Sequence, residues 1–201
     1  MKITLITTIL FFSLFNVYSQ QVATYEEVEE INDIYYYKST TELFTGILQD
    51  TANITGDYMR IHLVNGIADG FFEGFYDEER TVLKWRVLFV DGAKEGEYIY
   101  YFEDGSIGFI ANMKANKLHG VRYCYYETGE LWHIHHYRKD KEHGKTITYN
   151  KSGQLTEIVR YKKGLKHGKY EKFYENGSLK QKGRFRKDKP KGRFREYDEY
   201  R

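Results

Sequence analysis

Histidine is the residue type in this sequence whose spacing first suggests chemistry, because three of the seven histidines recur at one interval. These three are each 24 residues apart: His119, His143 and His167. Imidazole is a common zinc ligand, but all ligands of a zinc site must lie within bonding distance of one ion. If each interval forms two β-strands, equivalent histidines stand roughly 9–10 Å apart, which is too far to share an ion. We therefore expect surface histidines and no metal site.

A second group of histidines lies within one short segment: His133, His135 and His136. On a strand, the first two would share a face, because successive side chains alternate. No carboxylate or cysteine is placed with them at a spacing typical of zinc ligation. The same interpretation, surface histidines, is favoured over a metal site.

Motifs of catalysis are absent from the sequence. It contains no glycine-rich phosphate loop, no G-x-S-x-G nucleophile elbow and no H-E-x-x-H motif. The single cysteine, Cys124, lies among tyrosines, and we expect a small hydrophobic side chain, with a reactive thiol as the alternative. We predict that the protein is not an enzyme and uses no cofactor.

Charge is distributed unevenly along the chain, although the formal net charge is only +2. Residues 20–79 contain 13 acidic and 2 basic side chains, whereas residues 160–201 contain 6 acidic and 16 basic ones. The densest basic run is a candidate patch for an anionic partner: Lys182, Arg184, Arg186, Lys187, Lys189, Lys191, Arg193 and Arg195. The alternative is a solvated sheet edge that lysines protect from pairing.

A 24-residue period runs through most of the chain and indicates repeated structural units. Two glycine series carry the period: Gly70, Gly96, Gly120, Gly144, Gly168 and Gly192, and Gly105, Gly129, Gly153 and Gly177. An aromatic series keeps the same register: Tyr101, Tyr125, Tyr149, Phe173 and Tyr197. Upstream the period continues to Gly46, with two inserted residues in the charged segment 77–80.

Each unit has the pattern of a β-hairpin. Runs of aromatic and β-branched residues flank turns such as Asn176-Gly177, and Asn-Gly is a strong hairpin signal because both residues tolerate positive φ. Pairs such as Asn65-Gly66 and Lys163-Gly164 connect one hairpin to the next. The sequence therefore predicts an all-β fold, an elongated, twisted, single-layer antiparallel meander of about seven hairpin repeats.

Two structural roles follow from the repeated positions. The aromatic series is expected to stack between neighbouring hairpins. The glycine before the first strand of each unit, such as Gly144, is expected to have positive φ or no room for a Cβ atom.

The stretch YKKGLKHGKYEKFYENGSLKQKGRF resembles the MORN-repeat variant of bacterial exported proteins, with its K-x-G-x-x-H-G, aromatic and N-G-x-L landmarks. The resemblance covers about Gly46 to the C-terminus and is clearest from Asp91 to Arg195. It implies a twisted antiparallel sheet of hairpins and a role in protein or lipid contact. Some relatives are labelled antitoxin components, which fits poorly with an exported protein.

The N-terminal part of the chain differs from the repeats. Residues 1–19 have the pattern of a signal peptide, with Lys2, an apolar segment and a cleavage site near Ser19-Gln20, so a secreted or periplasmic protein is expected. Residues 20–45 are predicted to cap the array of residues 46–201. Within them, T-x-x-E spacing predicts a short helix over about Tyr25 to Asn32, followed by a strand over Ile34 to Tyr37. No transmembrane segment is expected in the mature chain.

Together these patterns predict an exported, non-catalytic repeat scaffold that binds another macromolecule. The expected partner is a protein, with anionic lipid or acidic polysaccharide as alternatives for the basic end. Nucleic acid is not expected because of the export signal. An antitoxin-like inhibitor and a structural component of the cell envelope are the other two hypotheses.

Overall fold

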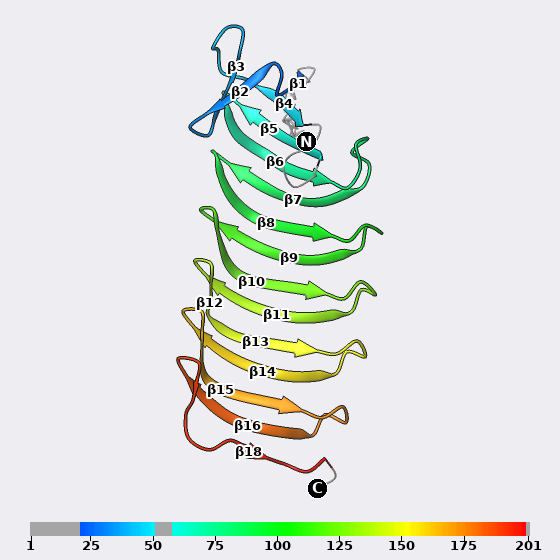
Figure 1. Cartoon of the computed structure of the whole chain (residues 1–201), viewed down its shortest axis with the longest axis vertical. Helices are drawn as coiled ribbons and strands as arrows, with labels where there is room; N and C mark the ends of the chain where they lie inside the picture. Colours follow the sequence, from blue (N-terminus) through cyan, green and yellow to red (C-terminus); the bar gives the residue numbers. More distant parts are fainter. Residues whose placement is uncertain (1–20, 51–57, 200–201) are drawn as a thin grey trace, which may run out of the picture.

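The computed structural model describes residues 21–50 and 58–199, which contain no helix, and hence none that could cross a membrane. Most strands belong to one long sheet in which hairpins follow one another down the molecule (Figure 1). Its strands are β1 (Val22–Thr24), β4 (Gly46–Asp50), β5 (Tyr58–Val64), β6 (Ile67–Phe75), β7 (Leu83–Val90), β8 (Ala93–Tyr101), β9 (Ile107–Lys114), β10 (Lys117–Tyr125), β11 (Leu131–Arg138), β12 (Lys141–Glu142), β13 (Gly144–Tyr149), β14 (Leu155–Lys162), β15 (Leu165–Phe173), β16 (Leu179–Arg186), β17 (Lys189–Pro190) and β18 (Arg195–Glu196). The predicted all-β repeat meander is confirmed.

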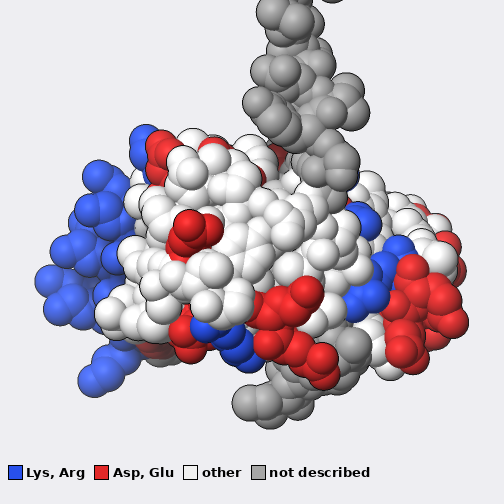
Figure 2. Space-filling view, turned by 90° about the horizontal axis from the view of Figure 1, so that it is seen from above, with Lys and Arg blue, Asp and Glu red and all other residues white. Residues whose placement is uncertain are grey.

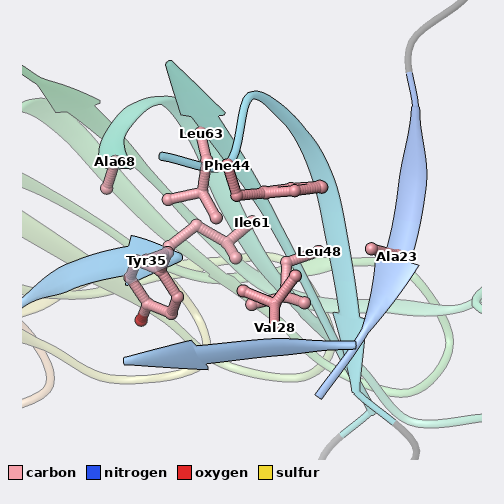
Figure 3. Packing of buried hydrophobic residues seen from close by; sticks show 8 residues of the cluster. All are labelled: Ala23, Val28, Tyr35, Phe44, Leu48, Ile61, Leu63 and Ala68. Atoms are coloured by element: carbon pink, nitrogen blue, oxygen red, sulfur yellow. The ribbon is translucent and has the colours of Figure 1, made fainter. Parts of the chain in front are cut away.

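The N-terminal segment departs from a single antiparallel layer. Strand β1 pairs with β4 in parallel, and β2 (Val28–Ile31) and β3 (Ile34–Tyr37) form a separate two-stranded sheet. This hairpin packs across one face of the large sheet (Figure 3). The two layers enclose the main hydrophobic cluster: Ala23, Val28, Tyr35, Phe44, Leu48, Ile61, Leu63 and Ala68. A second layer is needed because the first hairpins direct apolar residues toward this face.

The predicted N-terminal helix is wrong. Only half of the capping box forms: Thr24 N–H donates to Glu27 Oε2, but Thr24 Oγ1 accepts from Glu26 N–H, and Glu27 N–H donates to Thr24 O. These bonds close a turn instead of starting a helix, because Val28 then enters β2 and is fully buried. Burial in the tertiary structure has overridden a local helix signal.

The two edges of the large sheet carry different connections. On one side, which we call the turn edge, pairs of residues with positive φ link the hairpins in the manner of type I′ turns, such as Lys139-Asp140. On the other side, the loop edge, longer loops join the two strands of each hairpin. There Gly177 has positive φ and Asn176 does not, so the expectation that both residues of this pair adopt positive φ is wrong for Asn176. A bond from Gly177 N–H to Tyr174 O closes that turn.

In four hairpins the repeated glycine lies inside the first strand, not before it as predicted, and at a β-bulge: Gly70, Gly96, Gly120 and Gly168. Gly144 is the first residue of β13. In the pairing of β9 with β10, the register shifts between Leu118 and Arg122, and Gly120 between them has φ +94°. A Cβ atom at Gly120 would meet its nearest neighbour at 3.6 Å, an ordinary contact. Backbone conformation, rather than lack of space, therefore requires glycine here.

Successive turns at the turn edge are hydrogen-bonded to one another. The second residue of each turn donates its N–H to the preceding unit, as in Asp140 N–H to Leu118 O (3.0 Å) and Asp188 N–H to Lys166 O (3.0 Å). The same aspartates accept in return, since the N–H groups of Leu118 and Lys166 donate to their Oδ1 atoms. The six turns therefore form one continuous row that ties each repeat to the next.

The aromatic series does not stack as predicted. No two of its rings contact one another within the described ranges. Instead, the tyrosine that follows a member of the series in the chain donates its hydroxyl to the backbone of the next member. Tyr126 O–H donates to Tyr149 O, and Tyr174 O–H donates to Tyr197 O, each at 3.0 Å. Repeats are thus joined at the loop edge by side-chain to backbone hydrogen bonds rather than by stacked rings.

Candidate functional site

The C-terminal basic run folds into a patch on the last hairpin. Lys182 and Arg184 lie on one face of β16, and Arg195 of β18 pairs directly opposite Lys182. Lys191 N–H donates to Arg184 O at 2.8 Å, which brings the segment between β17 and β18 alongside. The result is an open hollow of about 430 Å³, which we call the C-terminal basic patch. Its charged lining is Lys169, Glu171, Lys182, Arg184, Lys191, Arg193 and Arg195.

The structure brings together five of the eight predicted patch residues and separates the other three. Arg186 and Lys189 pair opposite each other at the start of the last turn, and Lys187 occupies the turn itself. These three side chains belong to the turn edge. Sequence reasoning missed the contribution of Lys169 and Glu171, which the pairing of β15 with β16 places beside Arg184 and Lys182.

An aromatic cluster supports the patch from the opposite face. The Phe194 ring packs on Tyr170 and Phe185, with ring centroids 5.7 and 5.2 Å apart. It also covers Gly183, where a Cβ atom would lie 2.6 Å from the Phe194 ring. Phe194 follows Tyr170 by 24 residues and so continues an inner column of the repeat. Glycine at 183 lets this ring hold the last segment against the sheet.

The electrostatic field of the patch acts on Tyr197, whose ring lies 5.4 Å from Lys182 Nζ. A hydrogen bond with Lys182, together with the charges of Lys182 and Arg195, lowers the pKa of the Tyr197 hydroxyl below its usual range. Cations stabilise the ionised form of a neighbouring acid. The patch therefore favours negative charge placed next to it.

The central histidines are hydrogen-bonded to protein groups. His133 and His135 share a face, as predicted, and bind protein groups: His133 Nδ1 lies 3.0 Å from Thr148 Oγ1, and His135 Nδ1 lies 2.9 Å from Glu142 Oε1. His136, on the other face, contacts Lys145 O. Throughout residues 21–50 and 58–199, no three His, Cys, Asp or Glu side chains are grouped as metal ligands.

Burial of the imidazole, followed by the charge of His135, lowers the pKa of His133 below its usual 6.5. Between the two pKa values the unfolded chain binds more protons than the folded protein, so acidification favours unfolding. We expect the free energy of unfolding to fall as the pH drops below about 6.5. Urea unfolding at pH 7.5 and 5.5 measures this loss, and His133→Gln should reduce it. An unchanged loss in the variant would contradict the assignment.

Cys124 behaves as a half-buried hydrophobic side chain. Burial raises the pKa of its thiol, and the nearby charge of Arg122 only partly opposes this effect. A thiol with a raised pKa forms little of the reactive thiolate. This agrees with the interpretation of Cys124 as a packing residue.

Comparisons with known proteins identify the repeats. A search of curated proteins finds no match to this chain. The family model described as "MORN repeat variant" matches residues 118–139, 142–163 and 166–187. These segments coincide with three consecutive units of the sheet, running from β10 to β16. Repeats of this family are non-catalytic modules that generally bind proteins or lipids. Three consecutive units of this repeat protein, within residues 118–187, therefore match the MORN repeat variant.

Proposed function

We propose that this protein is an exported, non-catalytic scaffold that binds the acidic face of a protein partner through its C-terminal basic patch. The observation that carries the proposal is the hollow itself, in which six cationic side chains face a single carboxylate, that of Glu171. Unbalanced charge of this kind steers an oppositely charged partner and selects against wrong ones.

A protein partner is favoured by the composition of the patch. Arginine is enriched at protein–protein interfaces, and three of the six cations that line the hollow are arginines: Arg184, Arg193 and Arg195. The cluster of Phe185 and Phe194 on the opposite face keeps the backbone beneath the patch in place, so little backbone conformational entropy is lost when a partner binds.

Export and domain organisation belong to the same proposal. Residues 1–19 carry the pattern of a signal peptide and lie outside the described residues. We propose that residues 20–45 cap the array and that residues 46–201 form it. The packing of Val28, Tyr35 and Phe44 against the first hairpins supports a structural role for the segment 20–45.

Affinity capture with the tagged protein tests the proposed partner. The patch variant replaces Lys182, Arg184 and Arg193 with Gln, and a matched control replaces three cations outside the patch, Lys84, Lys145 and Lys151. The native protein and the control should recover the same partner, and the patch variant should recover at least tenfold less. Equal recovery by all three proteins would refute the proposed site. Circular dichroism of each variant checks that the sheet is intact.

A further inference from the structure

A second basic surface, unrelated to the C-terminal patch, runs along the turn edge of the array. Figure 2 shows Lys and Arg gathered on the left, the side on which the turn edge lies in Figure 1. The basic residues of these turns and their flanks are Lys94, Lys114, Lys117, Arg138, Lys139, Lys141, Lys162, Lys163, Lys166, Arg186, Lys187 and Lys189. Most of them lie outside the C-terminal run, in repeats near the centre of the molecule.

The cations of the turn edge are not balanced by ion pairs. Within the described ranges, none of these twelve side chains forms one. Several stand directly opposite one another across a turn: Lys114 opposite Lys117, and Arg138 opposite Lys141. Like charges in opposing positions destabilise a sheet. This arrangement costs stability, which an anion bound along the edge would restore.

Four carboxylates near the turns are engaged with protein groups. Asp140 and Asp188 accept the N–H groups of the preceding repeat, and Glu95 Oε1 accepts Ala115 N–H at 2.8 Å. Glu142 pairs with His135. The exposed groups at the edge are therefore mainly lysines, and an open hollow of about 580 Å³ is lined there by Lys117, Arg138, Lys139, Lys141, His143 and Lys163.

The opposite edge has the opposite charge. Its loops carry acidic residues in most repeats: Glu78, Glu79, Glu103, Asp104, Glu127, Glu130 and Glu175. A long polyanion is thus attracted to one edge and repelled from the other. Charge therefore differs between the two edges of the sheet, in addition to the difference between the acidic residues 20–79 and the basic residues 160–201.

From these features we infer that the turn edge binds a linear acidic polysaccharide lying along the array. Clusters of cations recur at the last four turns, from Lys114 and Lys117 to Arg186 and Lys189, at roughly 9–10 Å for two strand spacings. A nucleic acid strand carries phosphates more densely, at one per about 3.4 Å of helix axis in duplex DNA. The wider period suits a polymer that carries one acidic group on every second sugar.

The turn residues also favour a polysaccharide over other polyanions. The two central residues of the six turns are Asn65-Gly66, Asp91-Gly92, Ala115-Asn116, Lys139-Asp140, Lys163-Gly164 and Lys187-Asp188. They provide no aromatic ring on which a base would stack. They do provide amide, carboxylate and ammonium groups, which form hydrogen bonds with sugar hydroxyls.

Calorimetric titration with hyaluronan oligosaccharides, which carry one carboxylate per disaccharide, tests the inference. The edge variant replaces Lys117, Lys139 and Lys163 with Gln, and the control variant is the one with Lys84, Lys145 and Lys151 replaced. We expect affinity to rise with oligosaccharide length over several disaccharides and to fall with salt. The edge variant should bind at least tenfold more weakly than the native protein, and the control should bind normally.

Three outcomes would overturn the inference: no binding of the long oligosaccharides at low salt, equal binding by the edge and control variants, or binding only to vesicles containing phosphatidylserine. The inference is independent of the proposed protein partner. The variant of the C-terminal patch should retain polysaccharide binding, and the edge variant should still capture the partner. Failure of one experiment therefore leaves the other interpretable.

Discussion

Replacing Phe44 with Ala is expected to destabilise the N-terminal hairpins by about 3–5 kcal/mol, the usual cost of truncating a buried phenylalanine. The Phe44 side chain is 0% exposed and lies in the cluster between the two layers (Figure 3). Its ring meets the Tyr37 ring edge-on, with centroids 5.2 Å apart. Its backbone also joins the layers, since Phe44 N–H donates to Tyr35 O and Gly66 N–H donates to Phe44 O.

The measurement is hydrogen exchange followed by mass spectrometry, because repeats unfold partly independently and a single midpoint does not describe them. Amides of β1 to β6 should lose protection in Phe44→Ala, while amides of β13 to β16 keep it. Leu43→Ala is the control, since Leu43 is 47% exposed and its loss should cost about 1 kcal/mol or less. Equal effects of the two substitutions would show that the two-layer cluster does not stabilise this end.

Substitution of Gly144 with Asn is expected to cost about 1–3 kcal/mol, the strain of a side chain in a sparsely populated backbone region. Gly144 has φ +119°, and a Cβ atom there would lie 3.2 Å from His136 Cβ. Asparagine tolerates the left-handed region near φ of about +60°, but not this more extended conformation. The loss should appear as lower hydrogen-exchange protection of the amides in the central repeats.

Gly153 provides a matched comparison at the other glycine series. It has φ +75°, within reach of asparagine, and no atom lies within 4 Å of the position that a Cβ atom would occupy there. The same change, Gly153→Asn, should therefore cost under about 1 kcal/mol. If both substitutions cost the same, the backbone conformation does not set the requirement for glycine at position 144.

The repeat and its secondary structure could be predicted from the sequence alone. The 24-residue period of residues such as Gly120 and Gly144 reflects one hairpin per unit, and local turn chemistry is sufficient to place the strands. Strand β3 was predicted residue for residue, at Ile34 to Tyr37. Such features follow from interactions between neighbours in the chain, which a sequence displays directly.

Features that depend on contacts between units became visible only in the folded sheet. The Thr24 to Glu27 motif predicted a helix, but burial of Val28 under the first hairpins selected a strand. Residues of the basic run from Lys182 to Arg195 lie partly in the C-terminal basic patch and partly at the turn edge, because a two-residue turn directs Lys187 away from β16. The row of cations at the turn edge also joins lysines that are far apart in the chain. Its charge arises from stacking equivalent turns, and stacking is a property of the assembled sheet.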